Sequence, residues 1–147
     1  SCQIKMYFVN KDVNENNLRM ILNFGHTFAH AIEVKNNYSK KITHGEAVLS
    51  GMILAIRISL IKKVCTAGTA NEIEQIYKNN NLEYTYKKYS KKQSIDSLIP
   101  HLKNDKKNND EKINFMLLKK IGKTTLPNNH KISISSIKKL TRFIAQY

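Results

Sequence analysis

Two long apolar stretches constrain the fold of this chain more than any other feature. The first covers residues 18–35 and the second covers residues 43–63. Because strands are rarely so long, both stretches predict helices. In the second stretch Ala47, Gly51 and Ala55 recur at every fourth residue, so they share one face of the helix. Small side chains let two backbones approach each other, and we therefore expect a neighbouring helix to pack closely against this face.

The rest of the chain predicts shorter elements within one domain. Thr69 and Glu72 have the spacing of a capping box, which predicts a helix that ends near residue 78. The other expected elements are a short helix over 94–103 despite Pro100, a charged loop over 103–110, a strand or hairpin over 113–118, and a last helix capped by Ser135 or Ser136 that ends near Tyr147. The predicted fold class is mainly α with a small β-hairpin, and residues 1–147 suffice for a single domain with its own core.

Cysteine content and hydropathy argue against a secreted or membrane-spanning protein. Cys2 and Cys65 lie far apart and form no Cys-x-x-Cys pair, which excludes a disulfide framework and a zinc ribbon. No apolar run reaches the roughly 20 residues that cross a bilayer, and the first residues lack the pattern of a signal peptide. We expect a soluble, cytoplasmic protein without a membrane partner. Because the chain does not begin with Met, we also expect a fragment.

The formal net charge of +14 raises the question of a nucleic-acid partner. Surfaces that bind nucleic acids favour arginine, whose planar fork pairs with phosphates and guanine edges. Here only Arg19, Arg57 and Arg142 are arginines among 25 basic residues. Lysine, asparagine and isoleucine are abundant and all have A/T-rich codons, so codon bias accounts for the composition. We expect no specific nucleic-acid partner, and a non-catalytic basic domain stays the less favoured alternative.

The first predicted helix carries a narrow line of polar residues. At about 100° per residue they fall within an arc of roughly 80° on a helix that is otherwise apolar or small. These residues are Arg19, Asn23, His26, His30 and Glu33. Burial of such groups is costly unless they are paired or bind a ligand, so the line predicts a polar cavity. The alternative is an interior hydrogen-bond network in which both histidines are satisfied core residues.

Two further features of this region point to a site. Gly25, expected inside the helix, costs about 1 kcal/mol relative to alanine, which favours close approach of another backbone or a ligand there. His44 could join His26 or His30 around a metal ion, with a third ligand from Glu33, Glu46 or a part of the protein outside this chain. His26 and His30 have the spacing of a zinc-protease helix, but Thr27 replaces the general base and excludes that mechanism.

The sequence LNFGHTFAHAIE at 22–33, followed by HGEAV at 44–48, closely resembles the signature of 3-dehydroquinate synthases. The resemblance extends to residues 2–5, to Asp12 and Glu15, and to segments 105–107 and 113–122. It covers nearly the whole chain, but only the carboxyl-terminal half of such an enzyme. Ala29 and Asn17 stand where the family usually has glycine.

The resemblance implies the helical carboxyl-terminal domain of the dehydroquinate synthase-like fold. It also implies a lyase that converts 3-deoxy-D-arabino-heptulosonate 7-phosphate to 3-dehydroquinate and phosphate in the shikimate pathway of aromatic amino acid biosynthesis. Members of the family use NAD and a divalent metal, usually zinc or cobalt. Their cycle comprises alcohol oxidation, phosphate elimination, re-reduction, ring opening and aldol closure. The complete enzyme is expected to be a homodimer.

The resemblance also implies roles for individual residues. His26 and His44 would be metal ligands. The residues expected to be catalytic are His30, Lys106, Arg19 and Asn23, and those expected to bind substrate are Lys5, Arg19, Asn23, His30, Lys106 and Glu15. The family's third metal ligand, a glutamate, and its NAD-binding domain precede this region, so no residue here is expected to bind NAD. The isolated chain is therefore expected to be inactive.

One rival within the same enzyme class stays open. A related sugar-phosphate cyclase would form an inosose or a valiolone from another sugar phosphate. The region around Lys106 bears on the choice of substrate, and analysis of the products formed from both substrates distinguishes the two enzymes.

Overall fold

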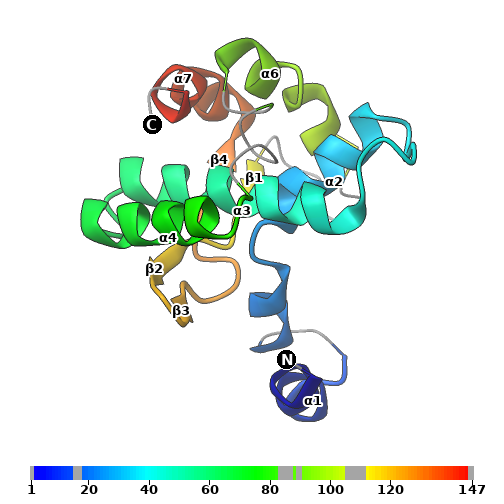
Figure 1. Ribbon diagram of the computed structural model, residues 1–147, viewed down its shortest axis with the longest axis vertical. Helices are drawn as coiled ribbons and strands as arrows, with labels where there is room; N and C mark the ends of the chain where they lie inside the picture. Colours follow the sequence, from blue (N-terminus) through cyan, green and yellow to red (C-terminus); the bar gives the residue numbers. More distant parts are fainter. Residues whose placement is uncertain (1, 15–17, 83–87, 89–90, 105–111, 146–147) are drawn as a thin grey trace.

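The computed structural model describes residues 2–14, 18–82, 88, 91–104 and 112–145. The helix α3 (His44–Ile61) lies at its centre, with α2 (His26–Lys35), α4 (Ala67–Asn79) and α7 (Ile134–Ile144) around it (Figure 1). The main apolar core joins α2 and α3 to α7 and includes Phe28, Ile32, Leu54, Ile58 and Ile137, all buried. The expected helix over 43–63 is confirmed.

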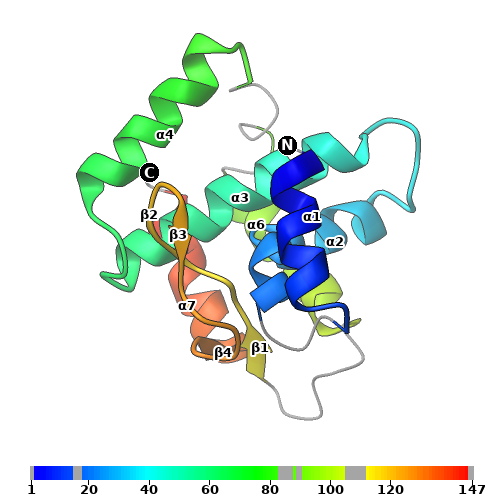
Figure 2. The same ribbon diagram turned by 90° about the horizontal axis from the view of Figure 1, so that it is seen from below.

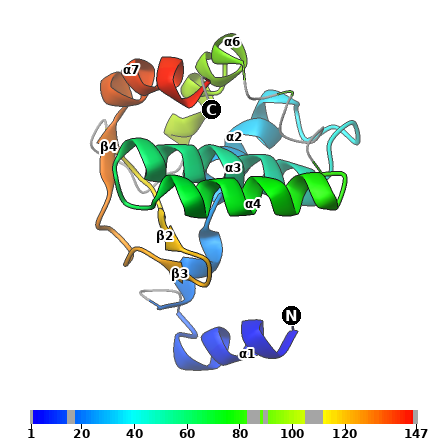
Figure 3. The same ribbon diagram turned by 60° about the vertical axis from the view of Figure 1, so that its left-hand side comes forward.

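Membrane-like hydropathy in α3 has a simple explanation in the fold. Among the described helices, α3 is the one long and apolar enough to cross a membrane by length and composition. More than half of it, 56%, is buried inside the protein. Figure 3 shows α4 running alongside it. The position of α3 in the core therefore explains its apolar sequence.

The small residues of α3 do allow a close approach, and α2 is the helix that makes it. A Cβ atom on Gly51 would lie 2.2 Å from the carbonyl oxygen of Gly25 and 2.9 Å from the amide nitrogen of Ala29. No side chain larger than glycine fits between the two backbones without displacing them. The expectation of tight packing on this face is confirmed.

The predicted single helix over 18–35 is wrong in its middle. The chain forms a 3-10 helix, η1 (Leu18–Asn23), and then begins α2 at His26 after a break at Gly25. Gly25 has φ 85°, in the left-handed region that side chains disfavour. A Cβ atom there would also lie 2.7 Å from the backbone nitrogen of Met52 in α3. Close approach of another backbone, one of the two uses expected for this glycine, is thus observed.

The sequence predicted the presence of the remaining helices better than the residues at which they begin. Thr66, not Thr69, caps α4, because its Oγ1 accepts a hydrogen bond from the Thr69 amide at 3.2 Å. In the same way Ser133 caps α7 in place of Ser135 or Ser136. The expected helix over 94–103 is instead α6 (Lys92–Asp96) followed by the 3-10 helix η2 (Ile99–Asn104). Pro100 has no amide hydrogen to donate, which favours the interruption.

Short antiparallel strands complete the fold. β1 (Lys112–Asn114) pairs with β4 (Lys131–Ser133), and β2 (Leu118–Lys120) forms a hairpin with β3 (Lys123–Thr124). The predicted strand or hairpin over 113–118 therefore splits between two small sheets. The fold class, mainly α with a small β component, is confirmed.

A helix that the sequence did not predict opens the structure. α1 (Cys2–Lys11) has no buried residues and stands apart from the main core, joined to it through η1 (Figure 1). In the view from below, α1 lies in front of the other helices (Figure 2). Its contacts with η1 matter for the site, because α1 carries Lys5. Most of the predicted charged loop over 103–110 lies outside the described residues.

Candidate functional site

Three histidines meet where α2 and α3 begin. His26 is the first residue of α2, His30 follows one turn later, and His44 is the first residue of α3. The ring centroid of His26 lies 5.7 Å from that of His30 and 5.6 Å from that of His44. The close α2–α3 packing at Gly51 brings these helix starts together. The structure thus places the two predicted metal ligands side by side.

The environment of His26 suits a metal ligand. Burial lowers its pKa, and the neighbouring rings of His30 and His44 lower it further. A lowered pKa keeps the imidazole neutral near pH 7, which is the form that binds metals. The Nδ1 atom of His26 is buried without a hydrogen-bond partner among the described residues. A buried nitrogen without a partner costs free energy, and a bound cation would relieve this cost.

A carboxylate fixes the proton on His44. The Oε1 atom of Glu33 lies 2.8 Å from Nδ1 of His44. An ionised carboxylate can only accept a hydrogen bond, so Nδ1 donates it. In the neutral ring the lone pair then belongs to Nε2, which is left available as a ligand atom.

Both candidate carboxylates in this region already accept hydrogen bonds. Glu33 accepts from His44, while Oε2 of Glu46 accepts from the amide and the hydroxyl of Thr43 at 2.7 and 2.8 Å. These hydrogen bonds from Thr43 also lower the pKa of Glu46. Within the described ranges, no three His, Cys, Asp or Glu side chains are grouped so that they could hold a metal ion. A metal site here would therefore need a ligand beyond the two predicted ones, His26 and His44.

A cavity of about 380 Å³ adjoins this histidine pair. It is lined by Lys5 from α1, Arg19, Leu22 and Asn23 from η1, and His26. Arg19 is anchored at its backbone, where its amide donates to Oδ2 of Asp12 at 2.9 Å, and its guanidinium donates to the carbonyl of Val13 at 3.0 Å. The structure thus gathers four residues with predicted roles at one cavity, although η1 and α2 are not one straight helix. Their individual roles stay predictions.

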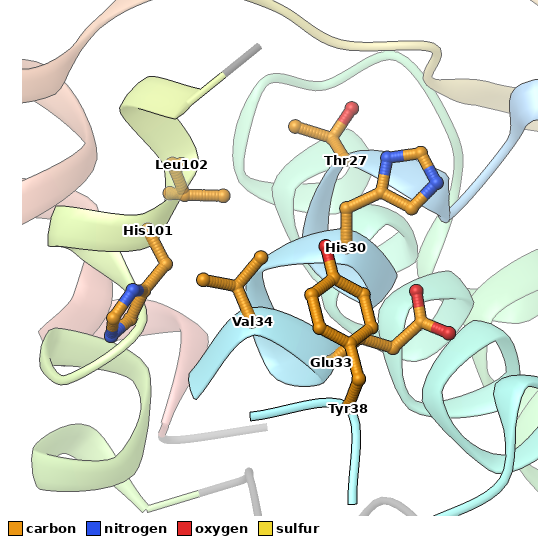
Figure 4. A pocket seen from close by; sticks show the side chains of 7 residues that line it. All are labelled: Thr27, His30, Glu33, Val34, Tyr38, His101 and Leu102. Atoms are coloured by element: carbon orange, nitrogen blue, oxygen red, sulfur yellow. The ribbon is translucent and has the colours of Figure 1, made fainter. Parts of the chain in front are cut away.

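His30 and Glu33 face a second cavity, of about 340 Å³. Its lining consists of Thr27, His30, Glu33, Val34, Tyr38, His101 and Leu102. Figure 4 shows His30, Glu33 and Tyr38 on one side, and His101 and Leu102 opposite them on η2. The predicted polar line is therefore divided between two cavities, and the division falls within α2, between His26 and His30.

Sequence reasoning missed several residues that line the second cavity, Tyr38 and His101 among them, and it singled out others that lie outside the described residues. His101 lies far along the chain from the histidine motifs, and no local pattern marks it. Lys106 and Glu15, both expected to bind substrate, lie outside the described residues, as does Asn17.

Comparisons with known proteins identify the family of this chain. Residues 1–108 match the family model described as 3-dehydroquinate synthase C-terminal. The 3-dehydroquinate synthase of Pelagibacter ubique is 42% identical over 122 residues, which are 83% of this chain and 33% of that protein. The enzyme of Endomicrobium trichonymphae is 42% identical over 124 residues, which are 84% of this chain and 33% of that protein. The chain thus spans about a third of the length of these relatives.

A solved structure has the same fold over almost the whole chain. It is a 2-deoxy-scyllo-inosose synthase complexed with carbaglucose-6-phosphate, NAD⁺ and Co²⁺. The TM-score is 0.76 at 25% identity, and the match covers 98% of this chain and 38% of that chain. The match over residues 1–108, together with the histidine motifs at the meeting point of α2 and α3, leads to one conclusion. This chain belongs to the 3-dehydroquinate synthase C-terminal family.

Proposed function

We propose that this chain is the metal- and substrate-binding domain of a 3-dehydroquinate synthase. The complete enzyme would convert 3-deoxy-D-arabino-heptulosonate 7-phosphate to 3-dehydroquinate and phosphate in the shikimate pathway. One observation carries the proposal: His26, whose ring lies 5.6 Å from that of His44, lines a cavity together with Lys5, Arg19 and Asn23. The names of the relatives, all 3-dehydroquinate synthases, support this substrate.

The cavity has the chemistry of an anion site. Lys5 and Arg19 are cations, and charge-assisted hydrogen bonds to a carboxylate or phosphate are stronger than neutral ones. Asn23 offers both a donor and an acceptor, which suits sugar hydroxyls. A substrate with a phosphate and a carboxylate would therefore find two cations and one neutral polar group around it.

His26 and His44 would hold the metal, zinc or cobalt, with a third ligand from the part of the enzyme that precedes this chain. When bound, the metal would act as a Lewis acid on a substrate hydroxyl, and NAD held by the preceding domain would accept and return hydride. His30 stands beside His26 and can hold or move a proton at a substrate oxygen. Residues 1–147 would thus form one domain of a two-domain enzyme. That this enzyme is a cytoplasmic homodimer stays a prediction.

A second candidate is a sugar-phosphate cyclase of the inosose synthase type. The structural similarity to 2-deoxy-scyllo-inosose synthase favours it, but that protein is 25% identical to this chain, whereas the 3-dehydroquinate synthases reach 42%. Similarity of fold between two cyclases of one class does not distinguish their substrates. The 3-dehydroquinate synthase is therefore the better supported function.

Product analysis decides between the two candidates. The full-length protein, supplied with NAD and Co²⁺, is incubated with 3-deoxy-D-arabino-heptulosonate 7-phosphate or with a hexose 6-phosphate, and the carbocyclic product and free phosphate are measured. We expect 3-dehydroquinate and phosphate in equal amounts from the first substrate and no cyclisation of the second. Formation of an inosose from the hexose phosphate alone would overturn the proposal.

A further inference from the structure

We infer that Glu33 is a positioning residue, which holds the His44 ring in the orientation and tautomer that a metal ligand requires. The inference rests on the proposed function, because it assumes that His44 binds the metal. It concerns a residue that touches neither metal nor substrate in the proposed site and acts only through His44.

The hydrogen bond links a side chain that is well fixed, that of Glu33, to one that is loosely held, that of His44. The Glu33 side chain is 15% exposed, whereas that of His44 is 60% exposed. Glu33 lies on α2 next to Ile32, which is fully buried in the core, so its backbone cannot shift freely. The hydrogen bond of 2.8 Å therefore fixes the exposed ring to a rigid helix.

The backbone and the side chain of His44 are held by different residues. Thr43 and Glu46 form a capping box that fixes the first turn of α3. This cap places the Cα atom of His44 but leaves the ring free to rotate between staggered rotamers. Among the described residues, the hydrogen bond that His44 donates to Glu33 supplies the missing restraint on the ring.

The same hydrogen bond selects the tautomer. Because Nδ1 donates to the carboxylate, the lone pair of the neutral ring lies on Nε2. Partners of this kind around metal-bound histidines typically change metal affinity by about 10–100-fold when they are removed. Two other interpretations are a direct Glu33 ligand and an ion pair that serves only the fold.

Titration of the metal-free full-length enzyme with Co²⁺, followed by visible absorption, tests the inference. The variants are Glu33→Ala and the nearly isosteric Glu33→Gln, with Glu72→Gln as a matched control, since Glu72 is an exposed carboxylate on α4 away from the site. We expect about 10–100-fold weaker Co²⁺ binding for Glu33→Ala and a smaller loss for Glu33→Gln, whose neutral amide is a poorer acceptor. Glu72→Gln is expected to bind like the wild type. The absorption bands of the loaded variants should keep their positions, because the ligand set is unchanged.

Four outcomes would overturn the inference, the last of them by overturning the proposed function. Wild-type affinity in both Glu33 variants would show that the ion pair serves only the fold, and shifted bands with lower coordination would show that Glu33 is itself a ligand. Should Glu33→Ala fail to fold, wild-type affinity in Glu33→Gln alone would decide against the inference. A wild-type enzyme that binds no Co²⁺ would instead overturn the proposed function and the inference with it.

Discussion

The contact between Gly51 and α2 predicts that a larger side chain at this position destabilises the packing of α2 against α3. In Gly51→Ala, the new methyl group would lie 2.2 Å from the Gly25 carbonyl oxygen, about 1 Å short of an ordinary contact. It would also lie 2.9 Å from the Ala29 amide, which donates the first hydrogen bond of α2 to that same carbonyl. Both neighbours are backbone atoms, so neither can rotate away, and the substitution must push α2 from α3.

The expected magnitude follows from two opposing terms. Overpacking of a well-packed interior costs about 1–3 kcal/mol, and the backbone location of the clash favours the upper end of that range. Replacement of glycine by alanine within a helix returns about 1 kcal/mol. The net loss is therefore about 2 kcal/mol of unfolding free energy, or a melting temperature lower by about 4–8 °C for a domain of this size.

Thermal unfolding of the 147-residue chain, followed by circular dichroism at 222 nm, measures this loss. Gly68→Ala is the matched control, because it makes the same exchange near the start of α4, where the new Cβ would meet only Oγ1 of Thr66 at 3.8 Å. The control should match the wild type or exceed its stability by up to about 1 kcal/mol. If Gly51→Ala is as stable as Gly68→Ala, the backbones of α2 and α3 do not approach as closely as described.

Three further predictions concern the site. Arg19→Ala in the full-length enzyme should lower kcat/KM about 10–100-fold in steady-state assays, because a charge-assisted hydrogen bond contributes about 1.5–3 kcal/mol. An unchanged kcat/KM would show that Arg19 does not bind the substrate. In urea unfolding, the metal-free chain should be less stable at pH 5 than at pH 7, because burial lowers the pKa of His26 in the folded state and the unfolded state therefore binds a proton first as the pH falls. The variant His26→Gln should show a smaller difference between the two pH values, and the same pH dependence in the variant and the wild type would contradict the prediction. The isolated chain should bind no NAD in calorimetry, and micromolar affinity would contradict the assignment of NAD to the preceding domain.

Long periodic elements were predictable from the sequence, whereas their ends depended on distant contacts. The helix over 43–63 follows from its apolar run alone. The break at Gly25 does not, because it arises where Met52, far along the chain, approaches the glycine backbone. Likewise Thr66 and Thr69 are both good caps, and the local sequence does not decide between them. Helix α1 has no buried face, so no hydrophobic pattern marks it.

For the site residues, too, local patterns were predictable and arrangements that depend on distant contacts were not. The histidine motifs and Arg19 stand out locally, because they are polar groups within an apolar segment. Their division between two cavities depends on the distant elements beside α2, since Lys5 of α1 lines one cavity and His101 of η2 lines the other. The link from Glu33 to His44 depends on how α2 packs against α3. His101 reaches the second cavity only through the position of η2 in the fold.

Metal retention in His44→Ala tests the central claim most directly. The full-length variant and the wild type are purified in parallel, their metal content is measured by mass spectrometry, and their synthase activity is assayed on the same samples. Circular dichroism is used to check that the variant is folded, which we expect because the side chain of His44 is 60% exposed. We expect the variant to lose bound metal and activity together, as the assignment of His44 to the metal requires. A folded His44→Ala enzyme that keeps its metal and its activity would contradict it.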